Sequence, residues 1–249
     1  MPGNYGFKYW VDIVMCIDGT GSMGPLLDTV KNNALSFYDD LVMKMASRSR
    51  EVEELRVKVI VFRDYLADGE NSMLVSDFYT LPKQAQEFET LVKSIQPFGG
   101  GDDPEDGLEA LAYAMKSDWT RGGNKRRHII IVWTDEGTHP LGFGKNPENG
   151  RNLTSMCGIP WEQIQHNAER YPQELPKEFD ELTDWWGDFD MPGVMDNTAK
   201  RLLLFAPGVN YWSTISDVWD NVIHYKAMAG QRLAEVEYEE ILRSICLCC

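Results

Sequence analysis

The chain alternates between short apolar runs and longer amphipathic stretches. Apolar, β-branched runs at residues 10–17, 55–62 and 128–133 each end in polar residues, as the buried strands of a parallel sheet do. Between the strands, apolar residues recur every three or four positions, which is typical of one face of a helix. The longest such stretch, from Pro25 to about Met45, predicts one long helix. We therefore expect strands and helices to alternate along the chain.

A further strand at residues 73–81 follows the second run closely enough to pair with it in the antiparallel direction. The remaining elements are expected at residues 84–95 (helix), from Pro104 (helix), 201–207 (strand), 222–227 (edge strand) and 238–245 (helix). This order predicts an α/β fold with a doubly wound, Rossmann-like sheet. The sheet would have six strands in total, mostly parallel and including one antiparallel edge strand, with helices on both faces.

The length of 249 residues fits one domain over 1–249. Between residues 138 and 198 the pattern loosens into Pro, Gly, Asn and aromatic residues, with helical stretches at 161–170 and 178–186. We interpret 138–198 as an insertion after the fourth strand, within the same domain. Its aromatic residues would form either a contact surface or a small satellite core.

Composition and charge argue against several classes of function and partner. No apolar run approaches the roughly 20 residues that cross a bilayer. The formal net charge of −15 would repel phosphate backbones, so nucleic acid is not an expected partner. The first residues lack the basic and apolar segments of a secretory signal, and we therefore expect a cytoplasmic protein.

The five cysteines are spaced too unevenly for a disulfide framework. Cys246, Cys248 and Cys249 crowd the last four positions. Three thiols could carry lipid or bind a soft metal, but a frayed end is the simpler interpretation. No membrane association is expected unless these cysteines are lipidated.

Oxygen-bearing side chains gather in three loops at predicted strand ends. Asp18, Thr20 and Ser22 follow the first strand, Asp102 lies in a glycine-rich loop before a helix, and Asp135 follows the fourth strand. Ligands of an open parallel sheet bind at the carboxyl edge of its strands, so these loops should converge. Because hydroxyl and carboxylate oxygens suit hard cations, we predict a site for Mg²⁺, with Mn²⁺ or Ca²⁺ as alternatives.

The motifs D-G-T-G-S-M, G-G-G-D-x-P-E and I-V-W-T-D-E resemble the three loops of the metal-ion-dependent adhesion site of von Willebrand factor type A domains. The likeness runs from about residue 9 to 245, the insertion excepted. It implies that Thr20 and Ser22 bind the metal directly and that Asp18 and Asp135 support it as anions. Asp102 stands where many members have threonine, and its charge should tighten metal binding while making the ion less attractive to an incoming carboxylate.

The resemblance is to the intracellular type of these domains, and it implies a non-catalytic protein–protein interaction module. Its cation would hold a protein partner through an acidic or hydroxyl-bearing side chain. Two alternatives stay open: a Mg-dependent phosphohydrolase, and a structural subunit of a larger assembly with a vestigial metal site. The enzyme would need a nucleophile or base beside the cation, and none is identifiable from the spacing.

Other interpretations of the same loops are weaker. Gly19, Gly21 and Gly24 outline a dinucleotide-binding fingerprint, but the acidic residue expected about 20 positions later falls inside the first helix. Asp103, Glu105 and Asp106 are interpreted as a charged first helical turn. His139 is expected in a solvated loop or a partner contact.

Overall fold

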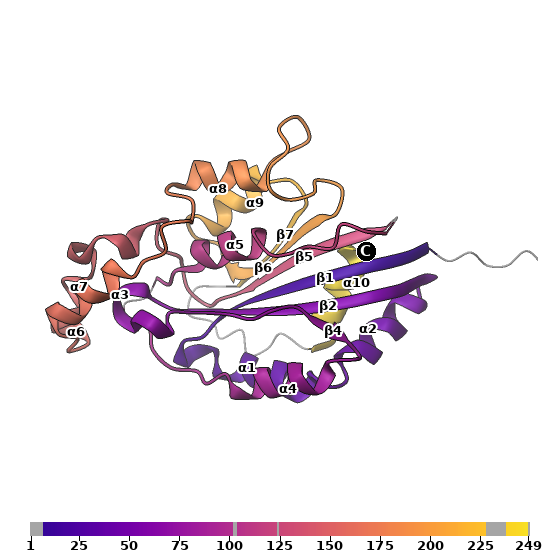
Figure 1. Ribbon diagram of the computed structural model, residues 1–249, viewed down its shortest axis with the longest axis horizontal. Coiled ribbons are helices and arrows are strands. Elements are labelled where there is room, and N and C mark those ends of the chain that lie inside the picture. Colours follow the sequence, from indigo (N-terminus) through magenta and orange to yellow (C-terminus); the bar gives the residue numbers. More distant parts are fainter. Residues whose placement is uncertain (1–6, 102–103, 124, 228–237, 249) are drawn as a thin grey trace, which may run out of the picture.

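The computed structural model describes residues 7–101, 104–123, 125–227 and 238–248, and places one mixed sheet between helices (Figure 1). The sheet has seven strands in the order β3-β2-β1-β5-β6-β7, and β4 also pairs with β2. The strands are β1 (Phe7–Asp18), β2 (Arg50–Phe62), β3 (Met73–Val75), β4 (Tyr79–Leu81), β5 (Arg126–Trp133), β6 (Lys200–Pro207) and β7 (Val222–Ala227).

The predicted fold class is confirmed, because β2, β1, β5, β6 and β7 run parallel while the edge strands β3 and β4 run antiparallel to β2. The sheet has seven strands rather than six because the strand expected at 73–81 is interrupted. At the interruption, the hydroxyl of Ser76 accepts the N–H of Val59 at 2.9 Å. The Ser76 hydroxyl thus accepts a hydrogen bond that a backbone carbonyl would accept in a continuous strand.

Helices cover both faces of the sheet (Figure 1). α1 (Gly24–Asn33), α2 (Phe37–Ala46), α4 (Ala85–Ser94) and α10 (Tyr238–Cys248) pack on one face, and α5 (Gly107–Met115), α8 (Phe179–Trp186) and α9 (Trp212–Val218) pack on the other. The remaining helices are η1 (Gly21–Met23), α3 (Tyr65–Asp68), η2 (Gly69–Asn71), η3 (Phe143–Lys145), η4 (Pro147–Gly150), α6 (Leu153–Met156) and α7 (Trp161–Glu169).

The continuous apolar run of β1 is explained by burial on both faces. Ile13, Met15 and Ile17 belong to one hydrophobic core, and Val14 and Cys16 belong to the other. Successive residues of a strand point to opposite faces, so a central strand is apolar at most positions. Asp12 is the exception inside this run, and its buried carboxyl is paired with Arg56.

The single long helix expected from Pro25 to Met45 is wrong, since α1 and α2 are separated by a turn at residues 34–36. In this turn the hydroxyl of Ser36 donates to the carbonyl of Asn33 at 3.3 Å, a local bond that competes with helical ones. The apolar face is nevertheless kept, because Val30 and Phe37 are both buried.

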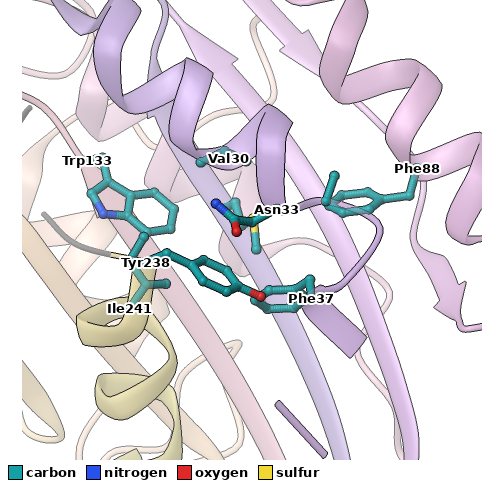
Figure 2. Close-up of a pocket in the computed structure, with 9 residues that line it drawn as sticks. Val30, Asn33, Phe37, Phe88, Trp133, Tyr238 and Ile241 are labelled. Carbon is teal, nitrogen blue, oxygen red and sulfur yellow. The ribbon is translucent and has the colours of Figure 1, made fainter. Parts of the chain in front are cut away.

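A small apolar pocket lies between α1, α4, α10 and the sheet (Figure 2). Val30, Phe88, Trp133 and Ile241 line it. Trp133, the last residue of β5, also stacks on Phe205 with ring centroids 5.8 Å apart. The aromatic end of β5 therefore packs firmly at the edge where the strand leaves the sheet.

Two hydrophobic clusters help to pack the segment 138–198 on the rest of the chain. α7 lies against α3 through a small cluster that includes Leu66, Leu153 and Ile164. α8 joins the main core through Leu182 and Trp186. The aromatic residues of this segment were expected to form either a core or a contact surface. Trp186 is fully buried in the core, whereas Phe189 is 90% exposed.

The interpretation of the last residues as a frayed end is wrong for Cys246 and Cys248, which are buried in α10. Arg50 Nη1 donates to the Cys246 carbonyl at 2.6 Å, and Arg127 Nε donates to the Cys248 carbonyl at 2.8 Å. These bonds satisfy carbonyls of the final helical turn. Cys249 lies outside the described residues. Within the described parts of the chain, no helix has both the length and the apolar character needed to span a bilayer.

Lys200 closes the carboxyl end of α8. Its side chain is fully buried, and Nζ donates to the carbonyls of Trp186 at 2.9 Å and Gly187 at 2.6 Å. Asp220 Oδ1 lies 2.9 Å from the same nitrogen. Burial lowers the pKa of Lys200, and the hydrogen bond to Asp220 opposes this shift.

We expect Lys200→Met to lower the free energy of unfolding by about 3 kcal/mol, because buried carbonyls lose their donor and Asp220 loses its counter-charge. Urea denaturation followed by circular dichroism measures this loss. Asp220→Asn is the control: its amide oxygen can still accept from Lys200, and the site is 41% exposed. Equal losses in the two variants would contradict the role assigned to Lys200.

Candidate functional site

The first loop of the site follows β1, which delivers Asp18 to the carboxyl edge of the sheet. Asp18 Oδ1 accepts the backbone N–H of Thr20 at 2.9 Å and its hydroxyl at 2.6 Å. The turn η1 then places Ser22 Oγ 3.4 Å from Thr20 Oγ1. Glycine is required at position 19, because an added Cβ would lie 2.5 Å from Val61 Cγ1.

The strand β5 adds the second loop. Ser22 donates its hydroxyl to Asp135 Oδ1 at 3.0 Å, and Thr134 donates to Asp18 Oδ2 at 2.8 Å. The structure thus brings Asp18, Thr20 and Ser22 of the first loop together with Asp135, which lies more than a hundred positions later in the sequence. Asp102, the remaining predicted ligand, lies outside the described residues. The role of all five as metal ligands stays a prediction.

The burial and charge of Asp18 and Asp135 determine how well this group could bind a cation. Asp18 is fully buried, and burial raises its pKa to about 6 although hydrogen bonds from Thr20 and Thr134 lower it. Asp135 is also buried and adds repulsion. Neither carboxyl makes an ion pair with a Lys or Arg of the described chain.

The donor set is therefore one of oxygens: two carboxyls and two hydroxyls, with no direct ion pair to a cationic side chain among the described residues and with Arg63 as the nearby positive charge. This set fits a hard divalent cation. Its hydroxyl groups are essential to this fit. Among the described residues, no group of three or more His, Cys, Asp and Glu side chains is placed to hold a metal. Asp102 would supply a third carboxyl.

Arg63 was missed by the sequence analysis. Its buried guanidinium donates from Nε to the carbonyls of Gly19 at 3.1 Å and Phe98 at 2.8 Å, and from Nη2 to Gln96 at 3.0 Å. It also lies over the Phe98 ring, 4.0 Å from its centroid. Arg63 thus ties the loop after β1 to the segment that precedes Gly99. The only sequence signal was an arginine placed directly after a buried strand.

The interpretation of Glu105 as part of a charged first helical turn is wrong. Glu105 is 3% exposed and precedes α5, which begins at Gly107. A Cβ added to Gly100 would lie 2.8 Å from Glu105 Oε1 and 3.1 Å from Thr20 Cγ2, so the carboxyl lies beside the first loop. Burial first, and then the charge of Asp18, raise the pKa of Glu105 to about 11. Glu105 is therefore neutral at pH 7.

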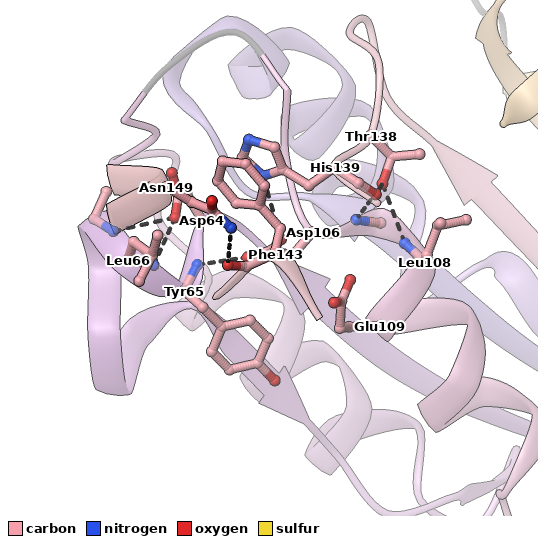
Figure 3. A network of polar contacts seen from close by, with 12 residues as sticks. Asp64, Tyr65, Leu66, Asp106, Leu108, Glu109, Thr138, His139, Phe143 and Asn149 are labelled. Carbon is pink, nitrogen blue, oxygen red and sulfur yellow. Dashed lines mark hydrogen bonds and ion pairs between the residues drawn. The ribbon is translucent and has the colours of Figure 1, made fainter. Parts of the chain in front are cut away.

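Asp106 and His139 are also buried rather than solvated (Figure 3). Asp106 Oδ2 accepts the N–H of Tyr65 at 2.6 Å, and its Oδ1 lies 3.3 Å from His139 Nδ1. The His139 ring stacks on Phe143 with centroids 3.8 Å apart. The expectation of an exposed His139 is wrong, because these contacts join α3, α5 and the loop after β5 into one packed unit.

Comparisons with solved structures find distant likenesses. The pilus adhesin SpaC of Lactobacillus rhamnosus GG is 19% identical over 50% of this chain and 14% of its own length, with a TM-score of 0.36. The vWF domain of the type V pili tip protein Mfa5 from Porphyromonas gingivalis is 21% identical over 52% of this chain and 39% of its own, with a TM-score of 0.33. This chain thus spans well under two thirds of either, and at these scores the likenesses do not bear on function. No curated protein sequence matches the chain.

The family assignment comes from sequence. A family profile described as the von Willebrand factor type A domain matches residues 13–138, which is half of the chain. The matched region runs from β1 to the loop after β5 and includes the three loops discussed above. With the mostly parallel sheet and its covering helices, this match shows that the chain belongs to the von Willebrand factor type A domain family.

Proposed function

We propose that the chain is a non-catalytic protein–protein interaction module that binds its partner through a divalent cation, with Mg²⁺ preferred over Mn²⁺ or Ca²⁺. The observation that supports this most is the hydrogen-bonded group of Asp18, Thr20, Ser22 and Asp135 at the carboxyl edge of the sheet. Its carboxyls are buried and form no ion pair with a Lys or Arg side chain among the described residues, although the nearby charge of Arg63 acts on Asp18. A bound cation would offset the negative charge that remains.

The exposure of the group suggests how a partner would approach. Ser22 is exposed, whereas Asp18 and Asp135 are buried behind it. We infer that Thr20 and Ser22 present hydroxyl oxygens to the cation, and that Asp18, Asp135 and Asp102 balance its charge. A carboxylate or hydroxyl of the partner would then occupy the open, solvent-facing side of the ion. Binding of an acidic partner to this strongly acidic chain should depend on the cation.

The phosphohydrolase alternative is less well supported. Such an enzyme needs a base or nucleophile beside the cation. His139 lies close to Asp135 in sequence, but it is 3% exposed, its Nδ1 faces Asp106, and its ring is covered by Phe143. No observation specifically favours a structural subunit with a vestigial site.

We expect Asp135→Asn to weaken Mn²⁺ binding at least about tenfold, because the amide keeps an acceptor for Ser22 but removes a charge beside the ion. Isothermal titration calorimetry with Mn²⁺ measures the change. Asp118→Asn removes an equal charge from an exposed position before β5, and should bind like the wild type. Equal Mn²⁺ affinities in wild type and Asp135→Asn would exclude this site.

We also expect partner capture to depend on the ion. The native protein should retain a partner in Mg²⁺ and release it on chelation, and Asp135→Asn should retain little in either condition. Affinity purification followed by mass spectrometry provides the measurement. A partner that stays bound after chelation, and binds Asp135→Asn equally, would contradict the cation-mediated mode while leaving the fold assignment intact.

The raised pKa of Glu105 predicts a pH dependence in the chelated protein. Its folded pKa of about 11 exceeds the ordinary value of 4.5, so the folded state binds one more proton between these values. The free energy of unfolding therefore falls as pH rises above about 4.5, by up to about 1.4 kcal/mol per pH unit.

Glu105→Gln removes this proton exchange while keeping a neutral side chain. Its stability relative to wild type should rise steadily between about pH 6 and about pH 8, as urea denaturation at each pH would show. Glu87→Gln, at an exposed position of α4, should leave the slope unchanged. Parallel pH profiles for wild type and Glu105→Gln would disprove the neutral state of Glu105.

A further inference from the structure

The loop of residues 187–195, hereafter the 187–195 loop, projects from the end of α8 away from the sheet (Figure 1). At its base the N–H of Val194 donates to the Trp185 carbonyl at 2.7 Å. At its tip Asp188 Oδ1 accepts the N–H groups of Asp190 at 2.8 Å and Met191 at 2.6 Å. Hydrogen bonds within the loop therefore stabilise its observed conformation.

This ordered loop presents apolar side chains to solvent. Phe189 is 90% exposed, Met191 67% and Val194 53%. An exposed aromatic side chain on a preorganised loop is the kind of anchor that dominates binding energy, because little conformational entropy is lost when it docks. The side chains of Asp188 and Asp190 flank Phe189 in sequence and are exposed, so the anchor has an acidic surround.

A pocket of about 550 Å³ lies beside the base of the loop, between the end of α5, the start of β5 and residues 194–196. Its size is within the range that accommodates an inserted aromatic group. Met115, Trp119 and Met195 give it an apolar floor, and Lys116, Arg121 and Arg126 give it a basic rim. Arg126 is paired with Asp196 at 2.9 Å, whereas Lys116 and Arg121 are exposed. This basic rim stands out in a chain with a net charge of −15.

We propose that two copies of the chain form a symmetric dimer in which the 187–195 loop of each copy enters this pocket of the other. Phe189 would lie on the apolar floor, and Asp188 and Asp190 would face Lys116 and Arg121. The loop and the pocket share Val194 and Met195, so they are adjacent on one surface. A two-fold axis near these residues would form both contacts at once, which is the geometry of an isologous interface.

The contact lies at the opposite end of the sheet from the cation site. Arg126 in the pocket begins β5 and Asp135 follows its end, and the 8 residues of this strand span about 26 Å at about 3.3 Å each. The dimer would therefore leave both carboxyl edges open. It would present two cation sites to a partner, and a bivalent partner would gain avidity from this arrangement.

Sedimentation equilibrium of the purified full chain tests the dimer directly. The wild type should self-associate, and more weakly at high salt because the rim contacts are charged. Phe189→Ser should lower the association constant at least about tenfold, since each dimer loses two buried rings. Met43→Ser removes a 63%-exposed apolar side chain from α2 on the other face of the sheet, and should leave association unchanged.

Charge reversal tests the pairing itself. Arg121→Glu and Asp190→Arg should each weaken association, and the double variant should regain much of it because the pair is restored with opposite signs. Two results would overturn the proposal: a wild type that stays monomeric at all concentrations, or a dimer unaffected by Phe189→Ser and Arg121→Glu. Neither result depends on the cation, so the dimer and the cation site can fail independently.

Discussion

Strands β1 and β5 lie side by side and run in the same direction, with Ile17 opposite Trp133. The next residue of β1 is Asp18, and Asp135 follows Trp133 by two positions. Two loops from distant parts of the sequence therefore leave the sheet at one point. The register cannot slip, because both strands are buried on both faces and a shift of one residue would exchange the two cores. The position of the candidate site thus depends on the packing of apolar residues far from it.

Charge sets the second condition on the site. Carboxyl groups are gathered at the carboxyl edge in greater number than cationic side chains, and the buried guanidinium of Arg63 gives its hydrogen bonds to backbone carbonyls. Glu105 avoids the resulting repulsion by staying protonated, as its raised pKa indicates. Asp18 instead gains hydrogen bonds from Thr20 and Thr134. Two buried carboxyls of this edge are therefore accommodated in different ways, Glu105 by protonation and Asp18 by hydrogen bonds.

Much of the fold could be predicted from sequence because apolar runs and helical periodicity report burial directly. The breaks at residues 34–36 and 76–78 could not, since they depend on single hydroxyls of Ser36 and Ser76 that bond to the backbone. The convergence of four of the predicted site residues followed from the rule that loops meet at the carboxyl edge. The burial of Glu105 could not be predicted, because it is set by tertiary contacts and the local sequence resembles an exposed helix start.

Arg63 has a consequence for how accurately the site is built. The same guanidinium holds Gly19, in the first loop, and Gln96 and Phe98, which lead into the glycine-rich loop that carries Asp102. Because one guanidinium bonds both segments, a shift of the first loop would also move residues 96–98. One side chain thus sets the distance between Gly19 and residues 96–98, so a substitution of Arg63 would disturb the first loop and the segment before Gly99 together.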